Sequence, residues 1–316
     1  MYNQPIPLSL YAPTRSLEIE KLIQKTHEFI GYLSKKGGPD PSDYLMLNTL
    51  LQYFSEDKSK SIVSENQLQE IREAFGEALS PETIQGWAYH KPLGYAGDFQ
   101  IIEKIYTYHT SSNPHLVKWD HFSHHQTATK AIRNRISFFL DQVWKAKTQA
   151  TTDCHILNLA SGPGRDMYET LNILGAPGIH LDCVEQDAHA INYAMNLCKN
   201  FLGHIQFCKK NVLRFTTNKT YHLIWSGGLF DYFNDSVFKR ILRRLLSFLK
   251  TNGKLVIGNF STTNPSRGYM DLFHWNLIHR TREELRQLAR DCGVPDDKIS
   301  IEQEPEGINL FLTITN

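Results

Sequence analysis

Residues 155–166 read His-Ile-Leu-Asn-Leu-Ala-Ser-Gly-Pro-Gly-Arg-Asp. A short apolar run ends in a loop of small residues, and a helical pattern follows from Arg165. Gly162 and Gly164 carry no side chain that would block a ligand or forbid unusual backbone dihedrals. In a doubly wound α/β sheet, ligands bind outside the carboxyl ends of the strands. The stretch therefore predicts a strand, a tight turn and a helix that meet at a binding site for a nucleotide-like ligand.

Strand and helix patterns alternate around this stretch, over residues 151–316. Such alternation is typical of a parallel sheet with crossover helices. The strands that we predict are residues 155–159, 180–185, 204–209, 221–226, 252–260, 298–303 and 308–315. The helices that we predict between them are residues 165–174, 187–201, 234–249 and 281–292. The last two strands share a short turn, which predicts a final antiparallel strand.

Residues 1–150 show helical patterns and no clear strand alternation. We therefore expect a separate, all-helical domain there, which covers the substrate or acts as a lid. The helices that we predict are residues 17–33, 43–54, 65–79, 99–107 and 126–144. Ser64 is the expected N-cap of the third of these helices.

The composition is that of an ordinary globular protein. The 316 residues are 41% hydrophobic and 21% charged, enough for one large domain and a smaller one. A net charge of +1 favours neither nucleic acid nor a membrane surface as a partner. The five cysteines form no C-x-x-C pair, which favours reduced thiols in a cytoplasmic protein. The first seven residues do not resemble a signal peptide, and no apolar run approaches the ~18 residues that span a bilayer.

The glycine spacing of the opening stretch excludes two common nucleotide loops. A G-x-G-x-x-G loop would need glycine where Met167 stands, and no Gly-Lys-Ser/Thr follows for a P-loop. The stretch instead resembles the glycine-rich motif of class I methyltransferases that depend on S-adenosyl-L-methionine (SAM). In that family an acidic-x-Gly-x-Gly-x-Gly loop passes close to the methionine and ribose of SAM. Here Asn158 replaces the usual acid and Ala160 the first glycine.

Further motifs follow in the order that this family shows. Glu185 ends the next predicted strand, about twenty residues after the loop, where an acid can accept hydrogen bonds from both ribose hydroxyls. Asp187 caps the next helix or assists Glu185. Asn211 follows the third strand, where the family usually carries an Asp that accepts the adenine amino group. The side-chain oxygen of Asn211 can do the same while the N–H of Val212 meets the ring, and a plain turn residue is the alternative.

Residues 224–233 resemble the family's strand-four motif, which lies beneath the methionine and the reacting methyl group. Small residues next to aromatic ones suit a sulfonium, which gains roughly 0.5–2 kcal/mol from an aromatic face. Asp231 can receive the SAM amino group or the substrate, whereas Phe230 and Phe233 are expected in the core. Residues 252–260 resemble strand five.

These resemblances imply an α/β fold with a Rossmann-like, seven-stranded SAM-binding sheet over residues 151–316, and SAM as the cofactor. The expected cofactor-binding residues are Ala160, Ser161, Gly162, Gly164, Asp166, Glu185, Gln186, Asn211, Val212, Ser226, Gly227, Asp231 and Arg133.

The helical half adds a candidate substrate loop at residues 92–99, Pro-Leu-Gly-Tyr-Ala-Gly-Asp-Phe. Together with residues 133–135, 264–267 and 275–281, this loop resembles a bacterial methyltransferase subgroup that includes enzymes making 3-hydroxy fatty acid methyl esters. A plain turn with Asp98 as a helix N-cap is the alternative. The residues that we expect over the sulfonium or the substrate are Tyr95, Asp98, Tyr106 and Tyr232, which are taken as catalytic, with Arg133 and Asn134.

An arginine matches a carboxylate with two hydrogen bonds, so Arg133 can hold the SAM methionine carboxylate or an acidic substrate. Arg280 is a second candidate. His121, His124 and His125 can share a helix face, but no carboxylate or cysteine stands at a matching spacing. Surface or pH-sensitive histidines, with no metal, are therefore the preferred interpretation.

The leading hypothesis is methyl transfer from SAM to a small-molecule acceptor, such as the carboxylate of a hydroxy fatty acid. One alternative is a SAM-consuming cyclase that forms azetidine-2-carboxylate and methylthioadenosine, and the other is a non-catalytic SAM-binding sensor. The expected partner is a small-molecule substrate, without nucleic acid or membrane, and the expected assembly is a monomer or homodimer.

Overall fold

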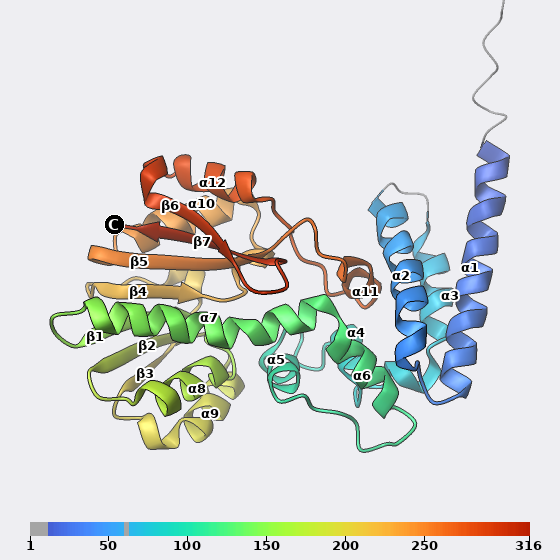
Figure 1. Ribbon diagram of the computed structural model, residues 1–316, viewed down its shortest axis with the longest axis horizontal. Coiled ribbons are helices and arrows are strands. Elements are labelled where there is room, and N and C mark those ends of the chain that lie inside the picture. Colours follow the sequence, from blue (N-terminus) through green and yellow to red (C-terminus); the bar gives the residue numbers. More distant parts are fainter. Residues whose placement is uncertain (1–11, 60–62) are drawn as a thin grey trace, which may run out of the picture. The chain divides into compact units, whose positions relative to one another are not determined.

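The computed structural model describes residues 12–59 and 63–316 (Figure 1). Contacts divide the chain into two compact units. The first unit comprises the described residues up to Ala96, Thr110–Ser123 and Pro265–Trp275, and the second Gly97–His109, His124–Asn264 and Asn276–Asn316. This division is discontinuous, and it assigns the helices Phe99–Tyr106 and Thr127–Gln149, which precede residue 150, to the second unit. The predicted domains, residues 1–150 and 151–316, stay a prediction. The first seven residues, which are predicted not to be a signal peptide, lie outside the described residues.

A seven-stranded sheet runs through the described part of the second unit, in the order β3-β2-β1-β4-β5-β7-β6. The strands are β1 (Cys154–Leu159), β2 (Ile179–Glu185), β3 (Ile205–Lys209), β4 (Tyr221–Ser226), β5 (Leu249–Phe260), β6 (Ile299–Gln303) and β7 (Asn309–Thr315). Neighbours from β3 to β5 are parallel, whereas β7 is antiparallel to both β5 and β6. The predicted α/β fold, its strands and the final antiparallel strand are confirmed.

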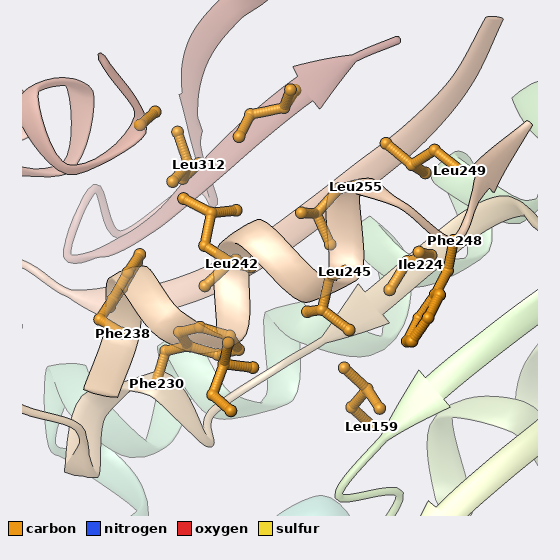
Figure 2. Close-up of a cluster of buried hydrophobic side chains, with 14 of the residues drawn as sticks. Leu159, Ile224, Phe230, Phe238, Leu242, Leu245, Phe248, Leu249, Leu255 and Leu312 are labelled. Atoms are coloured by element: carbon orange, nitrogen blue, oxygen red, sulfur yellow. The ribbon is translucent and has the colours of Figure 1, made fainter. Parts of the chain in front are cut away.

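Helices cover both faces of the sheet. On one face, α10 (Asp235–Leu246) and α12 (Arg282–Arg290) bury apolar side chains against β4, β5 and β7. Figure 2 shows Leu242 and Leu245 of α10 in this cluster, together with Ile224 of β4. On the other face, α7 (Thr127–Gln149) and α8 (Arg165–Leu174) pack on β1 and β2. The remaining helices of this unit are α5 (Phe99–Tyr106) and α9 (Ala188–Leu197).

The first unit is helical in its described residues. Its helices are α1 (Ala12–Lys35), α2 (Tyr44–Ser59), α3 (Glu65–Glu73), α4 (Ile84–His90), α11 (Arg267–Leu272) and most of α6 (Val117–His125). Short 3-10 turns in the two units are η2 (Pro41–Asp43), η3 (Gly76–Leu79), η4 (Lys199–Phe201), η5 (Val212–Arg214), η6 (Phe230–Tyr232) and η7 (Asp296–Lys298). Ser64 caps α3 as predicted, since its hydroxyl accepts the N–H of Gln67 at 3.3 Å.

Helix α11 joins the first unit although its residues are late in the sequence. Its Gly268 donates its N–H to Oε1 of Gln52 in α2 at 3.1 Å. A Cβ on Gly268 would overlap the carbonyl of Leu51, so the close approach of the two helices requires glycine. The sequence patterns did not predict α4 or α11, and they indicated α6 only as the helix face that His121, His124 and His125 can share. In the residues that the structure describes, no helix is both long and apolar enough to cross a membrane.

Four histidines stand side by side at the amino ends of the parallel strands. His155 lies in register with His180, and their ring centroids are 5.2 Å apart. The His222 ring lies 6.2 Å from that of His155, and the His204 ring 5.9 Å from that of His180. We call these four residues the histidine row.

Two charged side chains contact the histidine row, one at its His222 end and one at the inner His180. Nζ of Lys250 lies 3.4 Å from Nε2 of His222, and Asp153 Oδ2 lies 2.9 Å from Nε2 of His180. Burial lowers the pKa of both His155 and His222, and the positive charge of Lys250 lowers each further. Asp182 and Asp153 oppose this effect at His155. The folded protein therefore resists protonation of these two rings.

This geometry predicts acid sensitivity. The folded pKa values of His155 and His222 lie below the ordinary value of 6.5, so the unfolded chain takes up protons first as the pH falls. The stability that these two neutral histidines contribute is fully present above pH 6.5, and it is lost as the pH falls through their folded pKa values. We expect the melting temperature of His155→Gln to fall less than that of the wild type between pH 7.5 and 5. The exposed His189 in the same unit supplies the control His189→Gln, and equal pH dependence in both variants would contradict the prediction.

Candidate functional site

The glycine-rich loop after β1 is tied to the end of β2 by one carboxylate. Gly162 donates its N–H to Oε2 of Glu185 at 3.0 Å. Oε1 of Glu185 accepts the N–H groups of Gln186 at 2.7 Å and Asp187 at 3.0 Å. The parallel register pairs Leu159 with Val184, which brings the two strand ends together. The structure thus places the predicted acid beside the predicted loop.

The loop has the backbone of a glycine-rich turn although its first glycine is replaced. Ala160 has φ +52°, in the left-handed region that an L-residue adopts only under strain. Gly162 and Gly164 follow with φ +53° and +73°. A Cβ on Gly164 would lie 2.9 Å from Cε of Met167 and 3.0 Å from Cβ of Ala194. Gly164 therefore serves both the turn and the packing at the start of α8.

Asp166 lies in the first turn of α8, directly after this loop, and is half-buried. Its Oδ1 accepts the N–H of Met167 at 2.8 Å. Burial raises the pKa of Asp166 to about 6, and the nearby Asn158 and Trp225 side chains oppose the rise. The side chain of Asn158 stabilises the ionised carboxylate of Asp166, although its Nδ2 does not meet hydrogen-bond geometry. The strand position that lacks its usual acid therefore faces an acid from the helix.

Helix α5 brings Tyr106 to the same region. Glu103 forms an ion pair with Arg165 of α8, and the hydroxyl of Tyr193 donates to Glu103 at 2.8 Å. Burial raises the pKa of Tyr106, the charge of Asp166 adds to the rise, and the charge of Arg135 opposes it. The hydroxyl of Tyr106 thus lies within electrostatic reach of Asp166 and stays protonated at neutral pH.

The other three residues taken as catalytic have different surroundings. Asp98 is buried and caps α5, where its Oδ1 accepts the N–H groups of Gln100 at 2.9 Å and Ile101 at 3.0 Å. Asp98 is thus a helix N-cap, which was the alternative to a catalytic role, and its chemical role stays a prediction. Tyr95 is an exposed residue of the first unit, and Tyr232 is an exposed residue of η6. Their catalytic roles also stay predictions.

Asp231, predicted to receive an amino group, is buried where it supports the end of β5. Its Oδ1 accepts the N–H of Phe260 at 2.6 Å, and its backbone oxygen accepts the N–H of Ile278 at 2.7 Å. Burial raises the pKa of Asp231 to about 7, against the opposing charge of Arg135. Small residues, Gly227 and Gly228, precede it after the buried Ser226.

Arg135 is a buried charged residue beside Asp231 that the sequence analysis did not select as a candidate. It lies on α7 with its guanidinium over the Phe260 ring, at 5.1 Å from Cζ to the centroid, and Nη2 is 3.7 Å from Oδ2 of Asp231. The predicted Arg133 lies instead against Tyr108, at 4.0 Å from Cζ to the ring centroid, and donates to the oxygen of His124 at 2.8 Å. Residues two apart on a helix point in nearly opposite directions, so both arginines cannot face one site.

Two further predicted residues are engaged in structural contacts. Asn134 donates to Oε2 of Glu304 at 2.8 Å. Arg280 is buried and donates to the oxygen of Phe233 and to Oδ1 of both Asn259 and Asp235. Arg280 therefore holds the segments after β4 and β5 together.

The predicted adenine contacts lie at the end of β3. Asn211 is exposed, its Oδ1 accepts the N–H of Leu213 at 2.8 Å, and its Nδ2 donates to Gln186 at 3.0 Å. Val212 begins η5 directly after it. Asn211 and Gln186 thus join the ends of β3 and β2, and their contact with adenine stays a prediction.

Several buried polar atoms at this edge find no hydrogen-bond partner in the part of the chain that the structure describes. They are Nδ2 of Asn158, Oγ of Ser161, Oγ of Ser226 and Nη2 of Arg135. Buried polar groups in folded proteins are nearly always satisfied, so a group of exceptions in one place indicates a ligand or bound water. These atoms come from the ends of β1 and β4 and from α7, and they fit a polar ligand at the carboxyl edge.

The histidines predicted on one helix face do not gather around a metal position. His124 is buried with its Nε2 2.8 Å from the oxygen of His109, whereas His121 and His125 are exposed. Among the described residues, no three His, Cys, Asp or Glu side chains are arranged to hold a metal ion.

Comparisons with known proteins place the chain by its fold. No family model matches it, and no curated protein is similar enough to match. A solved structure described as a possible exported protein from Bordetella parapertussis is similar over 93% of this chain and 96% of its own, with a TM-score of 0.59 and 16% identity. At this identity the likeness shows the fold alone.

Two methyltransferase structures are similar with lower scores. The N-methyltransferase NodS from Bradyrhizobium japonicum, in complex with S-adenosylhomocysteine (SAH), has a TM-score of 0.42 and 15% identity, over 58% of this chain and 87% of its own. The 1,6-didemethyltoxoflavin-N1-methyltransferase from Burkholderia thailandensis has a TM-score of 0.44 and 14% identity, over 62% of this chain and 85% of its own.

The two loop glycines allow a matched stability test. Both have positive φ, so alanine at either position costs about 1–2 kcal/mol in strain. A Cβ on Gly162 meets no described atom within 4 Å, whereas a Cβ on Gly164 overlaps Met167 and Ala194, which adds about 1–3 kcal/mol. We expect urea unfolding to show Gly164→Ala as the less stable variant. Equal losses in the two variants would contradict this packing of the loop.

Proposed function

We propose that this chain is a SAM-dependent methyltransferase that acts on a small-molecule acceptor. The observation that carries the proposal is the Glu185 carboxylate at the end of β2, which accepts the N–H of Gly162 from the glycine-rich loop. A carboxylate has more acceptor positions than the three N–H groups that it receives here, so it can still accept ribose hydroxyls. This arrangement, at the carboxyl edge of the sheet, supports a nucleoside site.

The other residues of the edge fit the rest of SAM. Gln186, Asn211 and the N–H of Val212 are proposed to meet adenine at the end of β3. Asp166 is the acid proposed to pair with the ammonium group of the methionine part, since it is half-buried beside the loop. The hydroxyls of Ser161 and Ser226, which lack partners among the described residues, are proposed to bind polar atoms of the ligand.

Bound SAM supplies a methyl group that is already activated by its positively charged sulfur. The protein therefore aligns the acceptor with that carbon and excludes water. Tyr106, a neutral phenol near Asp166, is proposed to donate a hydrogen bond and to present an aromatic face to the cation. A carboxylate acceptor such as that of a hydroxy fatty acid needs no general base, whereas a hydroxyl or amine acceptor needs one.

Turnover with labelled SAM tests the proposal directly. SAM with an isotopically labelled methyl group is incubated with a panel of acids and amines, and the products are identified by mass. We expect SAH and a labelled acceptor, and we expect Glu185→Ala to weaken SAH binding about 10–100-fold because a charged hydrogen-bond acceptor is lost. Glu302→Gln, on β6 in the same unit, is the matched control.

Two other outcomes would each replace the proposal. Methylthioadenosine as the nucleoside product, without a labelled acceptor, would indicate the cyclisation of SAM. Tight SAM binding without any turnover would indicate a sensor.

The pKa of Asp166 predicts how cofactor affinity depends on pH. An ammonium group binds the ionised carboxylate, and burial raises the pKa of Asp166 to about 6. Protonation therefore removes the attraction as the pH falls through this value, so SAH affinity should rise between about pH 5 and 7 and level off above. Calorimetry should show that Asp166→Asn binds SAH about tenfold more weakly and loses this pH dependence.

The control for this experiment is methylthioadenosine, which has no ammonium group. We expect its affinity to change little with pH or with Asp166→Asn. A pH dependence of SAH binding that persists in the variant would show that another group titrates.

A further inference from the structure

The guanidinium of Arg135 is buried with part of its hydrogen-bonding capacity unused. Only 7% of the residue is exposed. Its Nε donates to Oδ1 of Asn309 at 2.7 Å, whereas Nη2 has no hydrogen-bond partner in the residues that the structure describes. An unmade hydrogen bond from a buried charged group is costly, so such a group indicates a ligand or a bound water at that position.

Asp231, the nearest carboxylate, does not complete it. Its Oδ2 lies 3.7 Å from Nη2, beyond hydrogen-bond distance. The N–H of Phe260 holds Oδ1 at 2.6 Å, and the N–H of Ile278 holds the backbone oxygen, so Asp231 is fixed to its own surroundings. Burial also raises the pKa of Asp231 to about 7, which leaves the charge of Arg135 only partly compensated at neutral pH.

The loop after β4 packs closely against this guanidinium. A Cβ on Gly228 would lie 2.5 Å from Nη1 and 3.2 Å from Cζ of Arg135. The backbone of a loop at the carboxyl edge therefore lies directly against the guanidinium. Tyr106 is within electrostatic reach as well, since the charge of Arg135 opposes the rise in its pKa. Arg135 thus belongs to the same edge as the proposed cofactor site.

We propose that Arg135 is a carboxylate receptor, in which Nη1–H and Nη2–H donate to the two oxygens of one carboxylate. The planar fork of a guanidinium matches this group. The carboxylate of Asp231, 3.7 Å from Nη2, favours a monoanion over a phosphate dianion as the ligand. This inference rests on the proposed function, under which the carboxylate comes from the methionine part of the cofactor or from an acidic acceptor.

The first experiment tests the cofactor as the source. SAH is compared by calorimetry with its decarboxylated analogue, which keeps the nucleoside, the sulfur and the amine. We expect the wild type to bind SAH about tenfold or more tightly than the analogue, and Arg135→Gln to reduce this ratio to about twofold or less. Arg240→Gln, at an exposed arginine of α10 in the same unit, should keep the wild-type ratio.

The second experiment tests an acceptor as the source. Protein saturated with SAH is titrated with octanoate and with methyl octanoate, which differ in the charge of the carboxyl group. If the acceptor is the source, the wild type binds octanoate more tightly than the ester, and Arg135→Gln loses this preference. If Arg135→Gln loses the preference for the carboxylate ligand in either experiment, Arg135 is the carboxylate receptor. The experiment in which the loss occurs identifies the molecule that supplies the carboxylate.

Arg135→Gln leaves Asp231 buried without its cation, so its folding has to be checked by circular dichroism. Arg135→Gln/Asp231→Asn removes both charges, and Gly228→Ala displaces the guanidinium while Arg135 itself is unchanged. The proposal is overturned if both preferences persist in the folded members of this set. If the wild type binds neither SAH nor methylthioadenosine, the proposed function fails. If it binds both and the affinity ratios do not change when Arg135 is substituted, only this inference fails.

Discussion

The convergence of three backbone N–H groups on the Glu185 carboxylate is the constraint on which the site depends. One N–H comes from Gly162 after β1, and two come from the turn after β2. A buried carboxylate without such donors would be strongly unfavourable, so the strand ends and the loop must keep this arrangement in the folded state. The same bonds fix the loop backbone at the carboxyl edge of the sheet, where the proposed function places the nucleoside.

The opposite half of this edge is organised by a second buried carboxylate. Asp231 binds the N–H of Phe260 and lies near Arg135, so it fixes both the end of β5 and the charge on α7. Glu185 and Asp231 thus stand on either side of the loop after β1, one toward β2 and one toward β5. Under the proposed function, a ligand between them would be expected to meet the donor Arg135 and the acceptors Asp166 and Glu185. Such a mixture of charges suits a zwitterion better than a simple anion.

The sequence predicted the sheet well because apolar runs such as those of β1 and β4 end in turn signals and alternate with helical patterns. It did not predict α11, because that helix depends on Gly268 meeting α2 more than 200 residues away. Glu185 could be found from its spacing to the loop, whereas Arg135 was passed over for Arg133. The signal was present: Ile132, Phe139 and Val143 mark the apolar face of α7, and Arg135 lies on that face. A charged residue on a buried helix face needs a partner, and this rule would have selected it.

The loop differs at two positions from the methyltransferase motif that it resembles, and the structure shows the local geometry at both positions. Ala160 replaces a glycine, yet it adopts φ +52°, so the turn is kept at the cost of local strain. Asn158 replaces an acid, yet its amide faces the carboxylate of Asp166 from the next helix. An acid therefore lies beside this loop although β1 itself ends without one, because α8 carries Asp166 in its first turn.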